Sequence, residues 1–158
     1  MLRDRSGFTL IELIIVLSIL AILSSLTIPK YKKIIAYEKL DITAKQLVAD
    51  LREGQQKALA QETNVQADFY RNINGTSTDV YILKILEKNG YKKYKSVTLP
   101  KDIQLVDARF GNNNMLCTFS TSGKPTLNGH IKLENKNGQN LFVIVYQTGR
   151  IRISKDQP

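Results

Sequence analysis

The chain has 158 residues with a single cysteine, Cys117, and carries 23 lysines and arginines against 14 aspartates and glutamates. This length allows one small globular domain beside a membrane segment, and a lone cysteine excludes an internal disulfide. The formal net charge of +9, most of it in residues 64–158 with 14 basic and 7 acidic side chains, favours anionic partners such as nucleic acid or phospholipid headgroups.

An apolar run near the N-terminus is long enough to cross a membrane. As a helix, Phe8 to Ile28 would extend about 31 Å, roughly the thickness of a hydrocarbon core. Its one acid is Glu12, and a carboxylate inside a membrane costs about 2.5–3.5 kcal/mol on the mildest scales. Glu12 therefore either reaches the headgroups or pairs with a cation. A cut between Gly7 and Phe8 would supply that cation, an α-amine, on a neighbouring copy.

The string Gly7-Phe8-Thr9-Leu10-Ile11-Glu12 before an apolar helix resembles the prepilin signature of type IV pilins and type II secretion pseudopilins. The resemblance implies that a prepilin peptidase/methyltransferase cuts after Gly7 and methylates Phe8. It also implies that Glu12 aligns the subunit with other pilins in a filament, that Pro29 kinks the helix, and that an inner-membrane assembly platform is a partner. A secretory signal peptide is excluded, because its apolar core precedes the cleavage site.

Orientation in the membrane follows from the resemblance alone. Arg3 and Arg5 precede the span, but Lys30, Lys32 and Lys33 follow it, so the positive-inside count is not decisive. The prepilin resemblance implies a single-pass protein of the cytoplasmic (inner) membrane with its C-terminal domain outside, which joins the cell envelope or a pilus after assembly.

The helix is expected to run from Phe8 to about Gln61. After Pro29, apolar residues recur at helical spacing and predict one buried stripe: Leu40, Ala44, Leu47, Leu51 and Ala58. Charged residues are expected on the opposite face: Lys39, Asp41, Lys45, Asp50, Arg52, Glu53 and Lys57. Gly54 weakens the helix by about 1 kcal/mol and marks a close approach to a sheet.

The remainder of the chain predicts short strands with Gly-centred turns. The expected strands are Val65–Phe69, Asp79–Leu86, Tyr91–Leu99, Ile103–Val106, Met115–Phe119, Thr126–Leu127, His130–Glu134, Leu141–Tyr146 and Arg150–Ile153, with hairpin or turn signals at Asn74-Gly75 and Asn89-Gly90. The predicted fold class is α+β, with the long helix packed on a C-terminal antiparallel β domain in two layers. The predicted divisions are a cleaved leader (1–7), a membrane and assembly helix (8–29), an amphipathic half-helix (30–62) and the β domain (63–158).

A narrower resemblance covers most of the chain. Asp50–Gln61 resembles the end of the helix in GspH/FimT minor pseudopilins, and the order from Phe119 to Gly149-Arg150 resembles their C-terminal domain. Residues 64–110 match this group least, and their role is open.

Catalytic chemistry is not expected. His130 is the only histidine and has no partner at metal-ligand spacing, and Asp102 and Asp107 lack a third carboxylate for calcium. No triad, phosphate loop or dinucleotide fingerprint is present. We therefore expect no enzyme, no metal and no cofactor.

Two basic segments are candidate binding sites. Tyr91–Lys95 interleaves aromatics with lysines, but strand alternation would split it between two faces, so a solvated hairpin is favoured. In Gly149-Arg150-Ile151-Arg152, the isoleucines would face the core and the arginines would share the outer face, with Lys155 beyond. In the FimT-like branch, a GRxR string near the C-terminus is associated with binding of double-stranded DNA in natural transformation.

Three hypotheses follow. The first is a minor pilin or pseudopilin that joins or primes a type II secretion or type IV pilus filament, with membrane lipid around its span. The second is a minor pilin assembled in the same way that also captures DNA through Arg150, Arg152 and Lys155. The third is a monotopic enzyme or ligand-binding domain on a membrane anchor.

Overall fold

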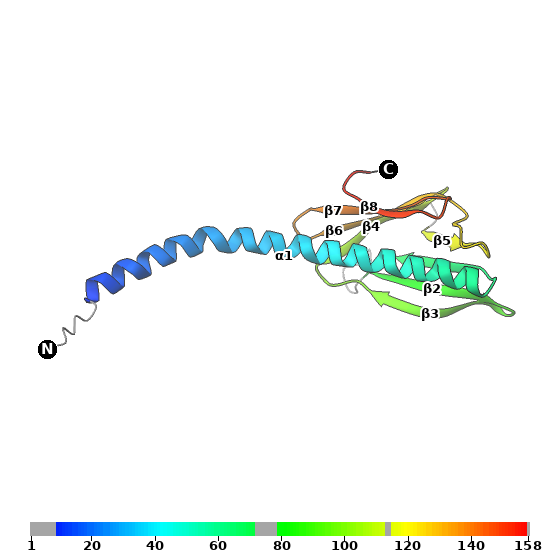
Figure 1. The fold of residues 1–158 in the computed structure, drawn as a ribbon, viewed down its shortest axis with the longest axis horizontal. Helices are drawn as coiled ribbons and strands as arrows, with labels where there is room; N and C mark the ends of the chain where they lie inside the picture. Colours follow the sequence, from blue (N-terminus) through cyan, green and yellow to red (C-terminus); the bar gives the residue numbers. More distant parts are fainter. Residues whose placement is uncertain (1–8, 72–78, 113–114, 158) are drawn as a thin grey trace, which may run out of the picture. The chain divides into compact units, whose positions relative to one another are not determined.

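The computed structural model describes residues 9–71, 79–112 and 115–157. These ranges contain one helix and eight strands, and Figure 1 shows their arrangement as a ribbon. They are helix α1 (Leu10–Ala60) and strands β1 (Val65–Tyr70), β2 (Val80–Glu87), β3 (Gly90–Thr98), β4 (Ile103–Phe110), β5 (Leu116–Phe119), β6 (Gly129–Asn135), β7 (Asn140–Val145) and β8 (Ile151–Ser154). The chain divides into two compact units, Met1–Ile35 and Ala36–Pro158, and helix α1 belongs to both.

The second unit contains two antiparallel sheets of four strands. Their orders are β3-β2-β1-β5 (the first sheet) and β4-β6-β7-β8 (the second sheet). The predicted hairpin at Asn89-Gly90 is confirmed, with Glu87 paired to Gly90 and a φ of +112° at this glycine. The α+β class and the long helix are therefore confirmed, while the turn predicted at Asn74-Gly75 lies outside the described residues.

The predicted buried stripe of helix α1 forms the centre of the core. Leu40, Ala44, Leu47, Leu51 and Ala58 are all fully buried. They pack with inward side chains of both sheets, among them Leu83 of β2 and Val143 of β7. The close approach predicted at Gly54 is confirmed, because a Cβ there would lie 3.4 Å from Val65 Cγ1 and 3.5 Å from Phe119 Cδ2.

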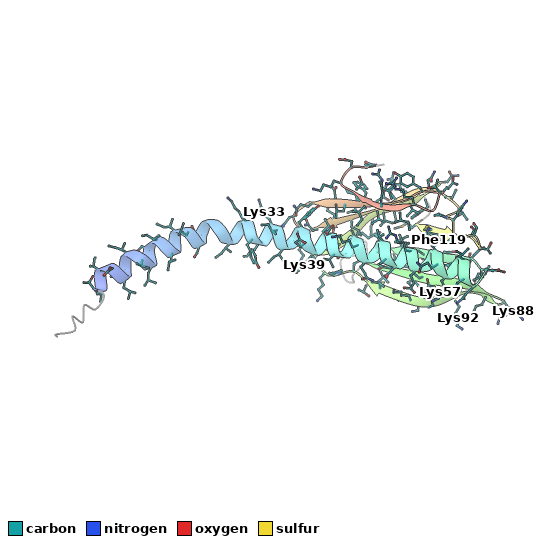
Figure 2. All side chains as sticks on the ribbon, in the orientation of Figure 1. Lys33, Lys39, Lys57, Lys88, Lys92 and Phe119 are labelled. Carbon is teal, nitrogen blue, oxygen red and sulfur yellow. The ribbon has the colours of Figure 1, made fainter. Side chains whose placement is uncertain are left out.

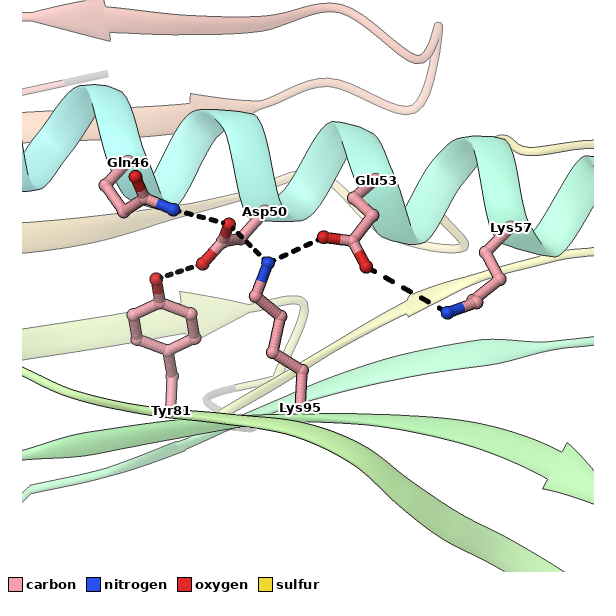
Figure 3. A network of polar contacts seen from close by, with 6 residues as sticks. All are labelled: Gln46, Asp50, Glu53, Lys57, Tyr81 and Lys95. Carbon is pink, nitrogen blue, oxygen red and sulfur yellow. Dashed lines mark hydrogen bonds and ion pairs between the residues drawn. The ribbon is translucent and has the colours of Figure 1, made fainter.

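One residue assigned to the charged face of the helix is buried instead. Asp50 is 2% exposed, and its carboxylate accepts hydrogen bonds from Tyr81 Oη at 2.5 Å, Gln46 Nε2 at 2.8 Å and Lys95 Nζ at 2.9 Å (Figure 3). Lys95 Nζ also lies 2.6 Å from Glu53 Oε2. Burial and the bond to Asp50 raise the pKa of Tyr81. The prediction that Asp50 faces solvent was wrong, because three donors, two of them from the first sheet, satisfy its carboxylate.

An irregularity in β3 explains how Lys95 reaches the helix. The β2–β3 register shifts after Leu83, which pairs with Lys95, whereas Lys84 pairs with Lys93. Tyr94 is the extra residue of this bulge, so Tyr94 and Lys95 are both partly buried instead of alternating. The predicted alternation in Tyr91–Lys95 was therefore wrong at this point. Lys92 and Lys93 are solvated as expected, and Lys92 pairs with Glu87 at 3.2 Å.

Two strand predictions also differ from the structure. Thr126–Leu127 is not a strand, and an isolated bridge joins Phe119 to Pro125 in its place. The backbone N–H groups that flank this bridge are bonded, from Ser120 to the Lys124 carbonyl and from Thr126 to the Thr118 carbonyl, both at 2.9 Å, but the pairing does not continue to Leu127. The fourth strand, predicted to end at Val106, continues to Phe110, because a register shift after Leu105 passes over Val106 and restores pairing with β6.

Candidate assembly helix and basic sheet face

Helix α1 begins with a side-chain cap. Thr9 directly precedes the first helical residue, and the backbone N–H of Glu12 donates to Thr9 Oγ1 at 3.3 Å. This pairing satisfies one of the free N–H groups of the first turn, and the carboxylate of Glu12 lies where the helix dipole favours negative charge. The Thr-x-x-Glu spacing is a capping signal that the sequence analysis did not use. Gly7 and Phe8 lie outside the described residues.

The first part of helix α1 is apolar on all sides and uncovered within its own unit. The most apolar 18-residue window of the helix is 0% buried, and it is long and apolar enough to cross a membrane. The exposed large side chains are Leu10, Ile11, Leu13, Ile14, Ile15, Val16, Leu17, Ile19, Leu20, Ile22, Leu23 and Ile28. Figure 2 shows side chains projecting from this part of the helix. A helix that is hydrophobic all round requires lipid or other protein around it.

Two serines in this run bond to the backbone of their own helix. Ser18 Oγ donates to the carbonyl of Ile14 at 2.8 Å, and Ser25 Oγ donates to the carbonyl of Ile22 at 2.7 Å. Such bonds to the preceding turn remove the cost of placing a hydroxyl in hydrocarbon. Glu12 is exposed and makes no side-chain ion pair within the described part of the chain. Helix α1 continues through Pro29, and the predicted kink there stays a prediction.

The C-terminal basic residues divide between two environments. Ile151 is 5% exposed and Ile153 packs against the core, so Arg152 points to the outer face of the second sheet as expected. Its Nε donates to Tyr146 Oη at 3.0 Å, and its guanidinium carbon lies 5.8 Å from the centre of that ring. Lys155, in contrast, places Nζ 5.4 Å from the ring centre of Tyr37 on helix α1. The structure therefore does not place Lys155 beside Arg152.

Strand register brings further residues beside Arg152 that the sequence analysis missed. Arg109 pairs with His130, His130 with Ile144, and Ile144 with Arg152, so these four form one row across the outer face of the second sheet. Arg109 Nε also contacts Asp107 Oδ2 at 2.6 Å. The positions are far apart in the chain, and only the register of four strands shows that they are aligned.

A hollow of about 410 Å³ lies at this end of the sheet. Its lining comprises Arg109, Gly111, Asn128, Gly129, His130, Ile144, Val145 and Tyr146. Partial burial lowers the pKa of His130, and the nearby Arg109 charge adds to this effect against the opposing charge of Asp107. The neutral imidazole and the Tyr146 hydroxyl offer hydrogen bonds, while Arg109 offers charge. Within the described residues, no group of three or more His, Cys, Asp or Glu could hold a metal ion.

Comparisons with known proteins find similarity both in the N-terminal sequence and in the fold. Residues 2–28 match the family model described as the prokaryotic N-terminal methylation motif. The minor pseudopilin EpsH of the Vibrio cholerae type 2 secretion system superposes with a TM-score of 0.58 at 16% identity, covering 73% of this chain and 96% of that one. The chain is pilin-like in motif and in fold. A comparison with curated protein sequences finds no match.

A second solved structure supports the same fold for this pilin-like chain. The type IV minor pilin FimU of Pseudomonas aeruginosa superposes with a TM-score of 0.57 at 14% identity, covering 75% of this chain and 90% of that one. The predicted likeness to the pilin and pseudopilin superfamily is confirmed in motif and in fold, and the likeness to its GspH/FimT-like minor members is confirmed in fold. The roles assigned to Gly7, Phe8, Glu12, Pro29, Arg150 and Arg152 stay predictions.

Proposed function

We propose that the chain is a minor pilin or pseudopilin, a non-catalytic subunit that joins or primes a filament of a type II secretion system or a type IV pilus. The observation that carries this proposal is the exposed apolar segment of helix α1, which lies within the matched methylation motif and is continuous with a folded domain. In a monomer in water this surface would be strongly unfavourable. Lipid before assembly and sister helices after assembly both cover it.

The proposal assigns a role to each part of the chain. Residues 1–7 are a leader removed by a prepilin peptidase/methyltransferase, residues 8–29 span the inner membrane and pack in the filament, and residues 30–62 continue the helix into an outer domain of residues 63–158. An inner-membrane platform drives assembly. Glu12 pairs with the new α-amine of Phe8 on a sister subunit, an interaction strengthened by the low dielectric of lipid.

The test is to express the full chain with its assembly machinery and to measure the mass of its N-terminus. We expect loss of residues 1–7 and one added methyl group on Phe8, and we expect Gly7→Leu to stay uncut and outside the filament. Glu12→Gln keeps the shape but removes the charge, so it should be cut normally and still assemble poorly. An uncut Gly7→Leu protein that assembles as well as the wild type would refute the proposal.

A second candidate function, capture of double-stranded DNA, is favoured by the row across the second sheet. Arg152 makes no ion pair with a described carboxylate, Arg150 is exposed beside it, and Arg109 lies at the far end of the same row. Three strand spacings of about 4.8 Å separate the ends of the row, a width of about 14 Å that reaches more than one phosphate.

Filter binding as a function of salt tests this candidate on a soluble fragment starting at Lys30. Each phosphate contact contributes about 0.9 to the slope of log affinity against log salt, so Arg150→Ala with Arg152→Ala should reduce the slope by about 2. Lys88→Ala with Lys93→Ala, on the β2–β3 hairpin, removes equal charge as the control. No retention of duplex at low salt, or equal slopes for both variants, would exclude DNA capture. A small ligand bound in the 410 Å³ hollow would instead favour a membrane-anchored binding domain.

A further inference from the structure

A ring of basic and aromatic side chains follows the apolar segment of helix α1. Lys30, Tyr31, Lys32 and Lys33 occupy consecutive helical positions directly after Ile28 and Pro29, and we call these four residues the collar. The three lysines are exposed, and Tyr31 is 63% exposed. Lys33 is labelled in Figure 2. The assembly role proposed above does not use the collar.

The lysines of the collar have no carboxylate partner in the described part of the chain. The next two lysines along the helix both do: Lys39 Nζ lies 3.1 Å from Asp102 Oδ2, and Lys45 Nζ lies 2.5 Å from Asp41 Oδ2. No aspartate or glutamate occurs between Glu12 and Glu38. Along the helix axis, Glu12 is about 27 Å from Lys30, and Glu38 is about 8 Å from Lys33. Charges in solution at physiological salt are screened over about 8 Å, so neither carboxylate neutralises the collar effectively. The collar is therefore a local, uncompensated positive charge.

The arrangement of the collar indicates what kind of anion it contacts. Successive helical residues are turned by about 100°, so four consecutive residues point in all directions around the axis. Their rise from Lys30 to Lys33 is only about 4.5 Å. A duplex or a protein groove approaches a helix from one side and would leave most of this ring unused. A membrane surface surrounds a spanning helix at one level and contacts the whole ring.

The dimensions of a bilayer agree with this geometry. The described apolar segment from Leu10 to Ile28 spans about 28 Å, close to the roughly 30 Å hydrocarbon core. The polar layer on each side is about 5–7 Å thick, which accommodates the rise of the collar. Tyrosine is also a residue enriched at membrane–water interfaces. With the apolar segment in hydrocarbon, the collar falls in the headgroup layer at the C-terminal end of the span.

We propose that the collar binds anionic phospholipid headgroups, and that this contact fixes the depth of the unassembled subunit in the membrane. The proposal rests on the membrane-spanning subunit described under Proposed function. Each lysine near an anionic surface contributes about 1 kcal/mol, so a lipid site beside one lysine should prefer a negatively charged headgroup about fivefold. This role also explains why basic residues lie on both sides of the span, since the collar lysines that follow the span bind lipid and do not set its orientation.

The experiment uses the full chain reconstituted in vesicles of phosphatidylcholine with about one third phosphatidylglycerol. Electron spin resonance of spin-labelled phosphatidylglycerol and spin-labelled phosphatidylcholine gives the relative association of each lipid with the protein. We expect about a fivefold preference for phosphatidylglycerol that falls towards 1 in 1 M salt, where the screening length is about 3 Å. Lys30→Gln with Lys32→Gln and Lys33→Gln should lower it to the level that Arg3 and Arg5 support. Arg3 and Arg5 are unchanged, so their contribution cancels in the comparison.

The matched control removes the same charge from the folded domain. Lys88→Gln, Lys93→Gln and Lys101→Gln are at exposed positions without an ion pair in the described structure, and this triple variant should keep the wild-type preference. No preference in the wild type, or equal loss in both triple variants, would overturn the proposal. So would an intact lipid preference in the collar variant combined with loss of self-association, which would place the lysines against a sister subunit. Flotation of the vesicles separately reports insertion, and a chain that does not float with them would refute the spanning helix itself.

Discussion

Replacement of Lys95 by methionine tests the buried network between helix α1 and the first sheet. Lys95 Nζ contacts Asp50 Oδ1 at 2.9 Å and Glu53 Oε2 at 2.6 Å, and the Asp50 side chain is only 3% exposed. Methionine has an unbranched side chain of similar length, but it carries no charge. It leaves the carboxylates of Asp50 and Glu53, less than one helical turn apart, without the cation that they share. Breaking a buried pair by removing one partner costs about 3–5 kcal/mol. Because the Lys95 side chain is 31% exposed, we expect about 3 kcal/mol.

Urea unfolding of the fragment from Lys30 measures this loss. Lys93→Met, on the same strand but exposed and without an ion pair in the described structure, is the control and should change the free energy of unfolding by less than about 0.5 kcal/mol. Asp50→Asn added to Lys95→Met should restore at least about 1 kcal/mol, because the buried charge is removed as well. A loss in Lys95→Met no larger than that in Lys93→Met would refute the argument.

The pH dependence of the free energy of unfolding, compared between the wild type and Lys95→Met, tests the same ion pair independently. The bonds to Glu53 and Asp50 raise the pKa of Lys95 above its ordinary value of 10.5. A raised pKa in the folded state means that the stabilisation is complete below 10.5 and is lost as the pH rises through the folded value. The stability difference between wild type and Lys95→Met should therefore be constant near neutral pH and shrink in alkali. A difference that disappears on acidification above about pH 6 would contradict this assignment.

Further predictions concern single side chains of the core. The hydroxyl of Tyr94 is buried without a hydrogen-bond partner in the described structure, so Tyr94→Phe should stabilise the domain by about 1 kcal/mol in urea unfolding. Gly54→Ala should also stabilise by about 0.5–1 kcal/mol, since the new Cβ meets only ordinary contacts at 3.4–3.5 Å. Gly129→Ala should have the opposite effect, because the new Cβ would lie 2.2 Å from Phe110 Cδ1 and 2.4 Å from the Arg109 carbonyl oxygen. We expect it to lower the free energy of unfolding by at least about 3 kcal/mol. If Gly129→Ala unfolds no more easily than Gly54→Ala, the packing argument fails. Burial raises the pKa of the Cys117 thiol, so alkylation of the native protein should proceed only at the rate of unfolding.

Patterns local in sequence predicted the elements well. The stripe from Leu40 to Ala58 follows from helical periodicity alone, and the Asn89-Gly90 pair marked the turn between β2 and β3. The prediction failed at Thr126–Leu127, where the pairing with β5 ends after a single bridge at Pro125.

Contacts between distant strands could not be predicted in the same way. The burial of Asp50 depends on a bulge at Tyr94 that carries Lys95 to the helix, and nothing in the local sequence marks that bulge. Likewise, the alignment of Arg109 and His130 with Arg152 requires the register of four strands. Periodicity reports which face a residue takes, but the identity of its cross-strand neighbours is a property of the assembled sheet.

The hydroxyl of Thr9 that closes the first turn of helix α1 lies after the Gly7–Phe8 bond. Cleavage at that bond would therefore leave the N-terminal cap of the helix intact, with the backbone N–H of Glu12 still bonded to Thr9 Oγ1. The mature subunit would then enter the filament with its leading turn already formed, and the entropy of ordering that turn would not oppose docking.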